Sequence, residues 1–148
     1  MALVTGGSRG LGRAIALAFA AQGADVAVNY RGNVAAADET VARIRAAGRL
    51  GEAIQGDTSA GREAAEAIVK AALDAFGRID IMVNNAGIAQ VNPIVDVQPD
   101  EVSKILAVNV EGVLWGIQAA AKKFQERGHG GKIINASSIA GHDGFAML

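Results

Sequence analysis

The 148-residue chain contains no cysteine, which excludes disulfide bonds and metal sites built on thiolates. Its formal net charge is −1 with acids and bases interspersed, so no basic surface for nucleic acid or an anionic membrane is indicated. No apolar run reaches the ~18 residues of a membrane span. The N-terminus also lacks the basic start and cleavage site of a signal peptide. These absences predict a cytoplasmic protein.

Aromatic residues are scarce as well, at 4%, whereas small and apolar residues are abundant. The hydrophobic content of 51% argues against disorder, and the length fits one domain with a core over residues 1–148. Small side chains let helices pack closely on a sheet, so this composition favours a mixed helix and strand fold.

Short apolar segments alternate with segments in which apolar residues recur at helical spacing. The expected strands lie at 2–5, 25–30, 51–56, 79–87 and 130–138, separated by expected helices at 11–22, 34–47, 65–76 and 99–127. Strands joined by helical crossovers form a parallel sheet with helices on both faces. The sequence therefore predicts an α/β fold with a doubly wound parallel sheet of five strands.

Ligands of such sheets bind at the carboxyl ends of the strands. The turns that follow the five expected strands read TGGSRGLG, NYRGN, GDTS, NNAG and SSIAG. All five are rich in glycine or small polar residues, which predicts one continuous ligand crevice.

The turn from Thr5 to Gly12 lies between the first strand and the first helix. Gly6 permits a tight turn, and Gly10 and Gly12 let the backbone and the helix N-terminus approach a pyrophosphate. An ordinary glycine-rich turn is the alternative. Because this one opens a strand–helix–strand unit, we favour a Rossmann-type dinucleotide-binding site.

The spacing T-G-x-x-x-G-x-G resembles the short-chain dehydrogenase/reductase family, as do NNAG, AVNVEG and IINASSIAG further along. The segments LWGIQAAAKKF and GGKIINASSIAGHDGF are similar to acetoin/diacetyl reductases and 2,3-butanediol dehydrogenases. The segment VAVNYRGN is more similar to 3-oxoacyl-carrier-protein reductases. The resemblance implies an oxidoreductase that exchanges a hydride between a nicotinamide cofactor and a small ketone, diketone or secondary alcohol.

The cofactor-binding residues follow from these turns and from the resemblance. Asp57 matches the family residue that meets the adenine, although Asp57, Thr58 or Ser59 could equally cap the next helix. Asn84 to Gly87 is expected both to tie neighbouring strands together and to leave room for the cofactor ribose. The full set comprises Thr5, Gly6, Ser8, Arg9, Gly10, Leu11, Gly12, Asn29, Tyr30, Arg31, Asp57, Thr58, Asn85, Ala86 and Gly87.

The choice between NAD(H) and NADP(H) depends on charge at the end of the second strand. NAD-preferring sites usually place a carboxylate there for the ribose hydroxyls. Asp25 lies at the opposite end of this strand, and Asn29-Tyr30-Arg31 occupies the expected position. Arg31 and Arg9 could pair with a 2′-phosphate, so we expect NADP(H) to be favoured.

Two residues are candidates for the chemistry itself. Ser138 matches the family's catalytic serine and would donate to the oxygen on which negative charge develops. Asn109 falls on the apolar stripe of the long helix, with Val102, Ile105 and Leu106. It is either a buried asparagine with satisfied hydrogen bonds or, by the resemblance, the asparagine that holds a water in the proton relay.

His129 and His142 lack the spacing of metal ligands, so no metal site is expected. His129 is interpreted as a loop residue, and His142 could border a substrate pocket.

The family's proton donor is a tyrosine followed four residues later by a lysine. Tyr30 is the single tyrosine here, and it belongs to the adenosine end of the site. We therefore expect a fragment that stops before the catalytic helix and is inactive alone, from a full-length enzyme that is a homo-oligomer. Alternatives are a dinucleotide-binding module without turnover and a non-enzymatic interaction domain. Exposure of the fifth strand as a sheet edge predicts self-association.

Overall fold

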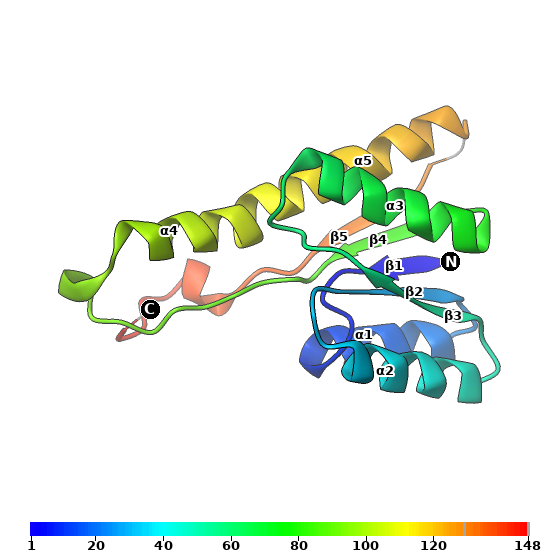
Figure 1. Cartoon of the computed structure of the whole chain (residues 1–148), viewed down its shortest axis with the longest axis horizontal. Helices are drawn as coiled ribbons and strands as arrows, with labels where there is room; N and C mark the ends of the chain where they lie inside the picture. Colours follow the sequence, from blue (N-terminus) through cyan, green and yellow to red (C-terminus); the bar gives the residue numbers. More distant parts are fainter. Residues whose placement is uncertain (129, 148) are drawn as a thin grey trace.

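A computed structural model describes residues 1–128 and 130–147, and in these ranges five parallel strands form one sheet between two helical layers (Figure 1). The strands are β1 (Ala2–Val4), β2 (Val26–Tyr30), β3 (Gly51–Gln55), β4 (Ile81–Asn84) and β5 (Lys132–Asn135). They lie in the order β3-β2-β1-β4-β5. The chain thus builds outward from β1 in one direction and then, from β4 on, in the other, which confirms the doubly wound fold.

Helices α1 (Gly10–Ala21) and α2 (Val34–Ala46) cover one face of the sheet, and α3 (Arg62–Phe76) and α5 (Gly112–Glu126) cover the other (Figure 1). Helix α4 (Pro99–Leu106) continues through a π-helical turn, η2 (Ala107–Glu111), into α5. Short 3-10 turns lie at Ile94–Asp96 (η1) and Ile139–Gly141 (η3). The single helix expected at 99–127 is therefore confirmed in extent, but it contains a π turn that the sequence pattern did not reveal.

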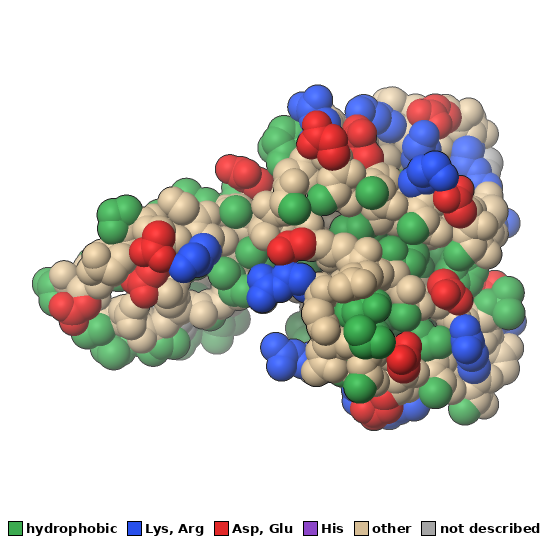
Figure 2. Space-filling view, viewed as in Figure 1, with side chains coloured by type: hydrophobic (Ala, Val, Ile, Leu, Met, Phe, Trp, Pro, Cys, Tyr) green, Lys and Arg blue, Asp and Glu red, His purple; other side chains and the backbone are tan. Residues whose placement is uncertain are grey.

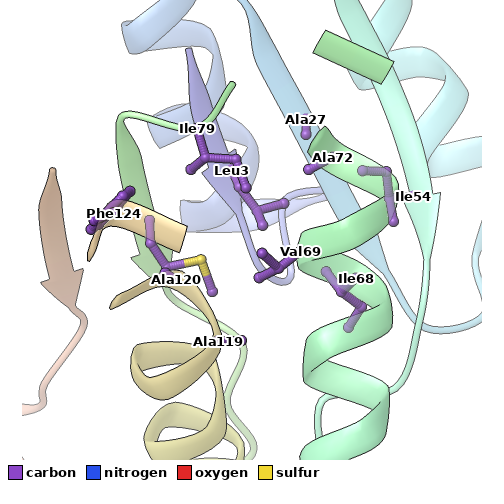
Figure 3. Packing of buried hydrophobic residues seen from close by; sticks show 11 residues of the cluster. Leu3, Ala27, Ile54, Ile68, Val69, Ala72, Ile79, Ala119, Ala120 and Phe124 are labelled. Carbon is purple, nitrogen blue, oxygen red and sulfur yellow. The ribbon is translucent and has the colours of Figure 1, made fainter. Parts of the chain in front are cut away.

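The core lies on both faces of the sheet, because successive strand residues point to opposite sides. Leu3 packs with Val69, Met82 and Phe124 beneath α3 and α5 (Figure 3). Its neighbour Val4 joins the cluster beneath α1 and α2. Small residues such as Ala72, Ala119 and Ala120, at most 3% exposed, allow the close helix–sheet packing that the composition predicts.

Helix α4 does not bury the apolar stripe expected for it. Val102 is 44% exposed and Leu106 is 48% exposed, so their predicted burial is wrong for this chain. The reason is visible in Figure 1, where α4 extends past the carboxyl ends of the strands as part of an arm. Of the helices described, none is both long and apolar enough to cross a membrane.

Candidate functional site

The turns after β1 and β4 are joined through Thr5, which is 3% exposed. Its Oγ1 donates to the Val83 carbonyl at 3.2 Å and accepts from the amides of Asn85 at 2.9 Å and Ala86 at 3.0 Å. Asn85 Nδ2 in turn donates to the Thr5 carbonyl at 2.9 Å. The expected tie between neighbouring strands is confirmed, and it lies at the point where the sheet changes its direction of growth.

Gly6 and Gly12 are required by close backbone contacts in this turn. Gly6 has φ +62°, and a Cβ at position 12 would lie 2.2 Å from the Gly6 carbonyl oxygen and 2.5 Å from Asn85 Nδ2. Only glycine at 12 lets the start of α1 approach the turn this closely. The turn, Asn85 and the helix N-terminus are therefore packed closely against one another.

Gly10 differs from the other two glycines because it borders open space. Its φ is +55°, and a Cβ there would meet nothing within 4 Å. Arg9, the residue before α1, is extended and supplies no side-chain cap to the helix, whose first amides are thus left without a side-chain acceptor. Leu11 is 67% exposed at the same end, whereas Ser8 is 8% exposed. An anion at this helix start would find both donors and room.

At the end of β2, Asn29 and Tyr30 are buried and Arg31 is exposed. Asn29 Nδ2 donates to the carbonyls of Ile54 at 3.2 Å and Gly56 at 3.0 Å, and the Asn29 carbonyl accepts from the Gly7 amide at 3.0 Å. Asn29 therefore supports the turns after β1 and β3 from within, with its side chain directed at β3. Arg31 is the residue of this trio that reaches solvent.

Asp57 lies in the turn after β3 and accepts from the amide of Ser59 at 2.9 Å and from its hydroxyl at 2.7 Å. Burial acts to raise the pKa of Asp57, but the two Ser59 hydrogen bonds and the charge of Arg31 outweigh it and lower the pKa. Helix α3 begins later and has Gly61 as its N-cap. The alternative that residues 57–59 cap this helix is wrong, because they close a separate turn before it.

The same turn is held from the other side by helix α5. A Cβ at Gly112 would lie 2.8 Å from the Thr58 carbonyl oxygen, so the helix and the turn touch backbone to backbone. Nearby, the Arg62 guanidinium lies 4.7 Å from the centre of the Trp115 ring, a cation–π contact between α3 and α5. A glycine in the middle of the helix expected at 99–127 was the one signal in the sequence for this contact.

Asn109 lies in the π turn, opposite the loop that follows β4. Its Nδ2 donates to the Ile88 carbonyl at 2.8 Å, and its Oδ1 accepts from the Ile88 amide at 2.9 Å. The expected satisfied hydrogen bonds are present, but the residue is exposed rather than buried. The cause is that the helix has already passed the edge of the sheet here. Gly87 packs beside this amide, and a Cβ added to Gly87 would lie 3.5 Å from Asn109 Oδ1.

Ser138 follows β5 and is exposed, with its Oγ accepting from the Ala140 amide at 3.2 Å. Strand β5 is fixed beside β4 by Asn84 Nδ2, which donates to Asn135 Oδ1 at 2.9 Å. His142 ends the η3 turn and is exposed, and His129 lies outside the described residues. Over the two described ranges, no three His, Asp or Glu side chains gather as a metal site requires.

Sequence reasoning missed one buried network beside the glycine turn. Arg13 Nη2 of α1 donates to the Ser8 carbonyl at 2.9 Å, and the Thr40 hydroxyl of α2 lies 3.0 Å from the same carbonyl oxygen. An arginine on the first turn of an amphipathic helix resembles a surface residue in sequence, so nothing in the pattern distinguished it.

With this geometry established, comparison with known proteins identifies the family. A family model described as short chain dehydrogenase matches residues 1–148. The chain belongs to the short-chain dehydrogenase family. The expected resemblance is thereby confirmed, as is membership of an enzyme family that uses a nicotinamide cofactor.

Among its relatives, L-2,3-butanediol dehydrogenase of Corynebacterium glutamicum is 43% identical over 149 residues, covering 100% of this chain and 57% of the relative. L-rhamnose 1-dehydrogenase (NAD(P)(+)) of Sphingomonas sp. (strain SKA58) is 42% identical over 138 residues, which cover 93% of this chain and 54% of the relative. A diacetyl reductase forming (S)-acetoin, from Staphylococcus epidermidis, is 41% identical over 147 residues, which cover 99% of this chain and 56% of the relative. The chain thus spans little more than half the length of these relatives.

Solved structures give the same picture. A putative short-chain alcohol dehydrogenase from Sinorhizobium meliloti 1021 superposes with a TM-score of 0.93 at 38% identity, covering 99% of this chain and 57% of that one. Acetoin dehydrogenase from Enterobacter cloacae superposes with a TM-score of 0.92 at 35% identity, covering 99% and 58%. The fold of the short-chain dehydrogenases is therefore shared over nearly the whole of this chain.

Proposed function

We propose that this chain is the dinucleotide-binding part of an NADP(H)-dependent carbonyl reductase or alcohol dehydrogenase. The observation that carries the proposal is the start of α1, where the amides have no side-chain cap and Gly10 borders open space. The cofactor diphosphate fits there, because the helix dipole and free N–H groups favour an anion. Figure 2 shows a hollow between the arm and the body of the molecule, with basic side chains at its edge.

The preference for NADP(H) is proposed from the charges at the end of β2. Arg31 and Arg9 are both exposed, on neighbouring turns. The carboxylate that could have favoured NAD(H), Asp25, lies before β2 and binds Arg49 Nη2 at 2.7 Å. Two guanidinium groups beside the adenosine ribose would pair with a 2′-phosphate, which a carboxylate would repel.

We assign the reaction to hydride exchange with a small ketone, diketone or secondary alcohol. When bound, the nicotinamide supplies the hydride or accepts it. Ser138 would donate a hydrogen bond to the carbonyl oxygen as negative charge develops there. Asn109 would position a water for proton transfer, from the loop edge that it shares with Ile88. The relatives named for butanediol, acetoin and diacetyl support this substrate class.

A second candidate is a 3-oxoacyl-acyl-carrier-protein reductase, because a Staphylococcus epidermidis enzyme of that name is 41% identical over 140 residues. In either case the proton donor is absent from this sequence, whose single tyrosine, Tyr30, is buried at the end of β2. We therefore propose that the 148-residue chain binds the cofactor without turning over substrate. For the whole protein we propose a cytoplasmic homo-oligomer, which fits a cofactor drawn from the cytoplasmic pool.

The test is calorimetric titration of the 148-residue chain with NADPH, using a matched pair of variants at Gly10. Gly10→Asn and Gly10→Asp have the same size and tolerate positive φ, but only Asp brings a negative charge to the proposed diphosphate position. We expect Asp to bind NADPH about tenfold more weakly than Asn, a difference of about 1.4 kcal/mol. Equal binding by the two variants, or no binding by the folded parent chain, would refute the proposed site.

Turnover is tested separately, by following NADPH oxidation with diacetyl as substrate. We expect no oxidation above the uncatalysed rate. Steady oxidation of NADPH by the purified chain would show that our assignment of the proton donor to a residue outside it is wrong.

A further inference from the structure

Arg13 on the first turn of α1 lies between the glycine turn and helix α2. Its Nε and Nη2 donate to the Ser8 carbonyl at 3.1 and 2.9 Å, and Nη2 also donates to the Ala36 carbonyl at 3.2 Å. Nη1 and Nη2 contact the two carboxylate oxygens of Glu39 at 2.8 and 3.0 Å. Only 19% of the side chain is exposed. One planar guanidinium thus connects the turn after β1 with the beginning of α2.

Thr40 completes this bridge from within α2. It is 0% exposed, and its Oγ1 accepts from Arg13 Nε at 2.8 Å. The same hydroxyl lies 3.0 Å from both the Ser8 and the Ala36 carbonyl oxygens. A hydroxyl has a single proton, so it donates to one of these carbonyls at a time while Arg13 serves the other.

The two backbone segments that the bridge joins carry the two proposed 2′-phosphate ligands. Arg9 directly follows Ser8. On the other side, Asn33 Oδ1 accepts from the Ala36 amide at 3.0 Å, and Arg31 lies two residues before Asn33. The Ala36 carbonyl therefore accepts a hydrogen bond from Arg13, and the Ala36 amide donates one to Asn33. Besides the bond from the Gly7 amide to the Asn29 carbonyl, a path of hydrogen bonds from Arg9 to Arg31 runs through Arg13.

We infer that Arg13 is a positioning residue for cofactor selectivity: it sets the spacing of Arg9 and Arg31, so that both reach one 2′-phosphate. The inference rests on the proposed NADP(H) function. Arg9 and Arg31 are exposed and have long, flexible side chains, so the position of their backbone decides whether they converge. The planar fork of Arg13 suits this role, because it binds two carbonyls and a carboxylate in a fixed geometry.

The diphosphate end of the site has contacts of its own, in addition to the Arg13 bonds to Ser8. Gly6, Gly12 and Asn85 fix the turn near the start of α1 without Arg13. Loss of Arg13 should therefore leave the binding of the part common to NADPH and NADH nearly unchanged. The loss should instead weaken the binding of the 2′-phosphate alone. A general loss of structure would weaken the binding of both cofactors.

The experiment measures the dissociation constants of NADPH and NADH for the 148-residue chain by calorimetry. For Arg13→Gln we expect NADPH to bind about tenfold more weakly and NADH to change by less than about twofold, in line with the cost of small misplacements. The control is Arg43→Gln, which removes an exposed α2 arginine that approaches Glu39 only to 4.0 Å. This control should keep the parent's ratio of the two constants.

A second pair of variants covers the case in which Arg13→Gln does not fold. Thr40→Val keeps the shape of the side chain and removes the hydroxyl, and Thr40→Ser keeps the hydroxyl. We expect Thr40→Val to lower the preference for NADPH and Thr40→Ser to retain it. Equal weakening of both cofactors, or an unchanged ratio in folded Arg13→Gln and Thr40→Val, would overturn the inference. A parent chain without preference for NADPH would instead overturn the proposed NADP(H) function, and this inference with it.

Discussion

Asn109 and Ile88 exchange two hydrogen bonds, side-chain amide to backbone, at 2.8 and 2.9 Å. The side chain of Asn109 thus bonds both the amide and the carbonyl of Ile88, as the backbone of a neighbouring strand would do. The loop after β4 is held against the π turn by this pair, although both residues are exposed. π turns interrupt helices frequently at functional sites, and here the turn brings an amide to the loop beside the crevice.

Replacing Asn109 should loosen this loop. Asn109→Leu removes donor and acceptor, whereas Asn109→Asp keeps the acceptor for the Ile88 amide and loses the donor. We expect Asn109→Leu to destabilise the chain by about 1 kcal/mol and to speed hydrogen exchange at the Ile88 amide, with Asn109→Asp retaining more protection there. Urea unfolding and amide exchange measure the two effects. Unchanged exchange at Ile88 in Asn109→Leu would show that the pair does not hold the loop.

The arrangement of strands, helices and turns was largely predictable because it depends on local patterns. The apolar segments at 2–5 and 25–30 are buried strands because their residues face helices on both sides of the sheet. Gly48 and Gly77, which directly follow the helices expected at 34–47 and 65–76, have φ +76° and +72°. The helix ends were predictable at these glycines, because residues other than glycine adopt a positive φ only at an energetic cost.

The features that were missed depend on where side chains meet across elements. The bonds from Arg13 to the Ala36 carbonyl and the Thr40 hydroxyl join residues whose contact depends on the close approach of α1 and α2. The direction of the Asn29 side chain toward β3 likewise depends on which strand lies beside β2. The exposure of Leu106 follows from how far α4 extends past the sheet. Periodicity describes one element at a time, so it could not predict these.

Gly10 and Gly12 of the first turn should respond differently to alanine. At position 12 the new Cβ would lie 2.2 Å from a backbone oxygen, which cannot move without opening the turn. We expect Gly12→Ala to cost about 3 kcal/mol of the free energy of unfolding, at the upper end of overpacking effects. Gly10→Ala meets no atom and should cost about 1 kcal/mol for its positive φ alone. Thermal unfolding of the two variants side by side checks the order, and the reverse order would contradict it.

Selectivity for NADP(H) should depend on Arg9 and Arg31 together. The double variant Arg9→Ala/Arg31→Ala loses both charges proposed for the 2′-phosphate and leaves the proposed diphosphate site at the start of α1 unchanged. We expect NADPH affinity to fall by about 2 kcal/mol or more, with little change for NADH, as each charged hydrogen bond contributes about 1.5–3 kcal/mol. Titration with both cofactors measures this, and equal losses for both would argue against the proposed phosphate site.

Acid should lower the free energy of unfolding by protonating Asp80, which lies just before β4 and binds the N-terminal ammonium beside β1. The Arg78 side chain, and after it the N-terminal ammonium of Met1, hold the pKa of Asp80 at about 2, below its ordinary 3.8, against the raising effect of burial. The stabilisation is complete above pH 3.8 and is lost as the pH falls toward 2. Asp80→Asn should therefore cost about 1 kcal/mol at neutral pH, a value limited by solvent screening, and almost nothing near pH 2.

Urea unfolding at several pH values tests this, with Asp74→Asn as the control. Asp74 pairs with Lys70 on the exposed face of α3, so its removal should have little effect. A loss in Asp80→Asn that does not depend on pH would mean that packing rather than charge accounts for it.

The chain should associate in solution through the face along α4, η2 and α5. Val102, Leu106, Val110 and Leu114 recur every four residues and are 44–55% exposed, so they form one apolar stripe on this helical segment. Within the described ranges, β5 pairs with β4 alone and leaves its other edge open. We expect sedimentation to show dimers or larger species, and Val110→Lys/Leu114→Lys to shift them toward monomer. Leu50→Lys, at a 66% exposed leucine before β3, should not do so. If the parent chain sediments as a monomer at high concentration, the stripe does not drive association.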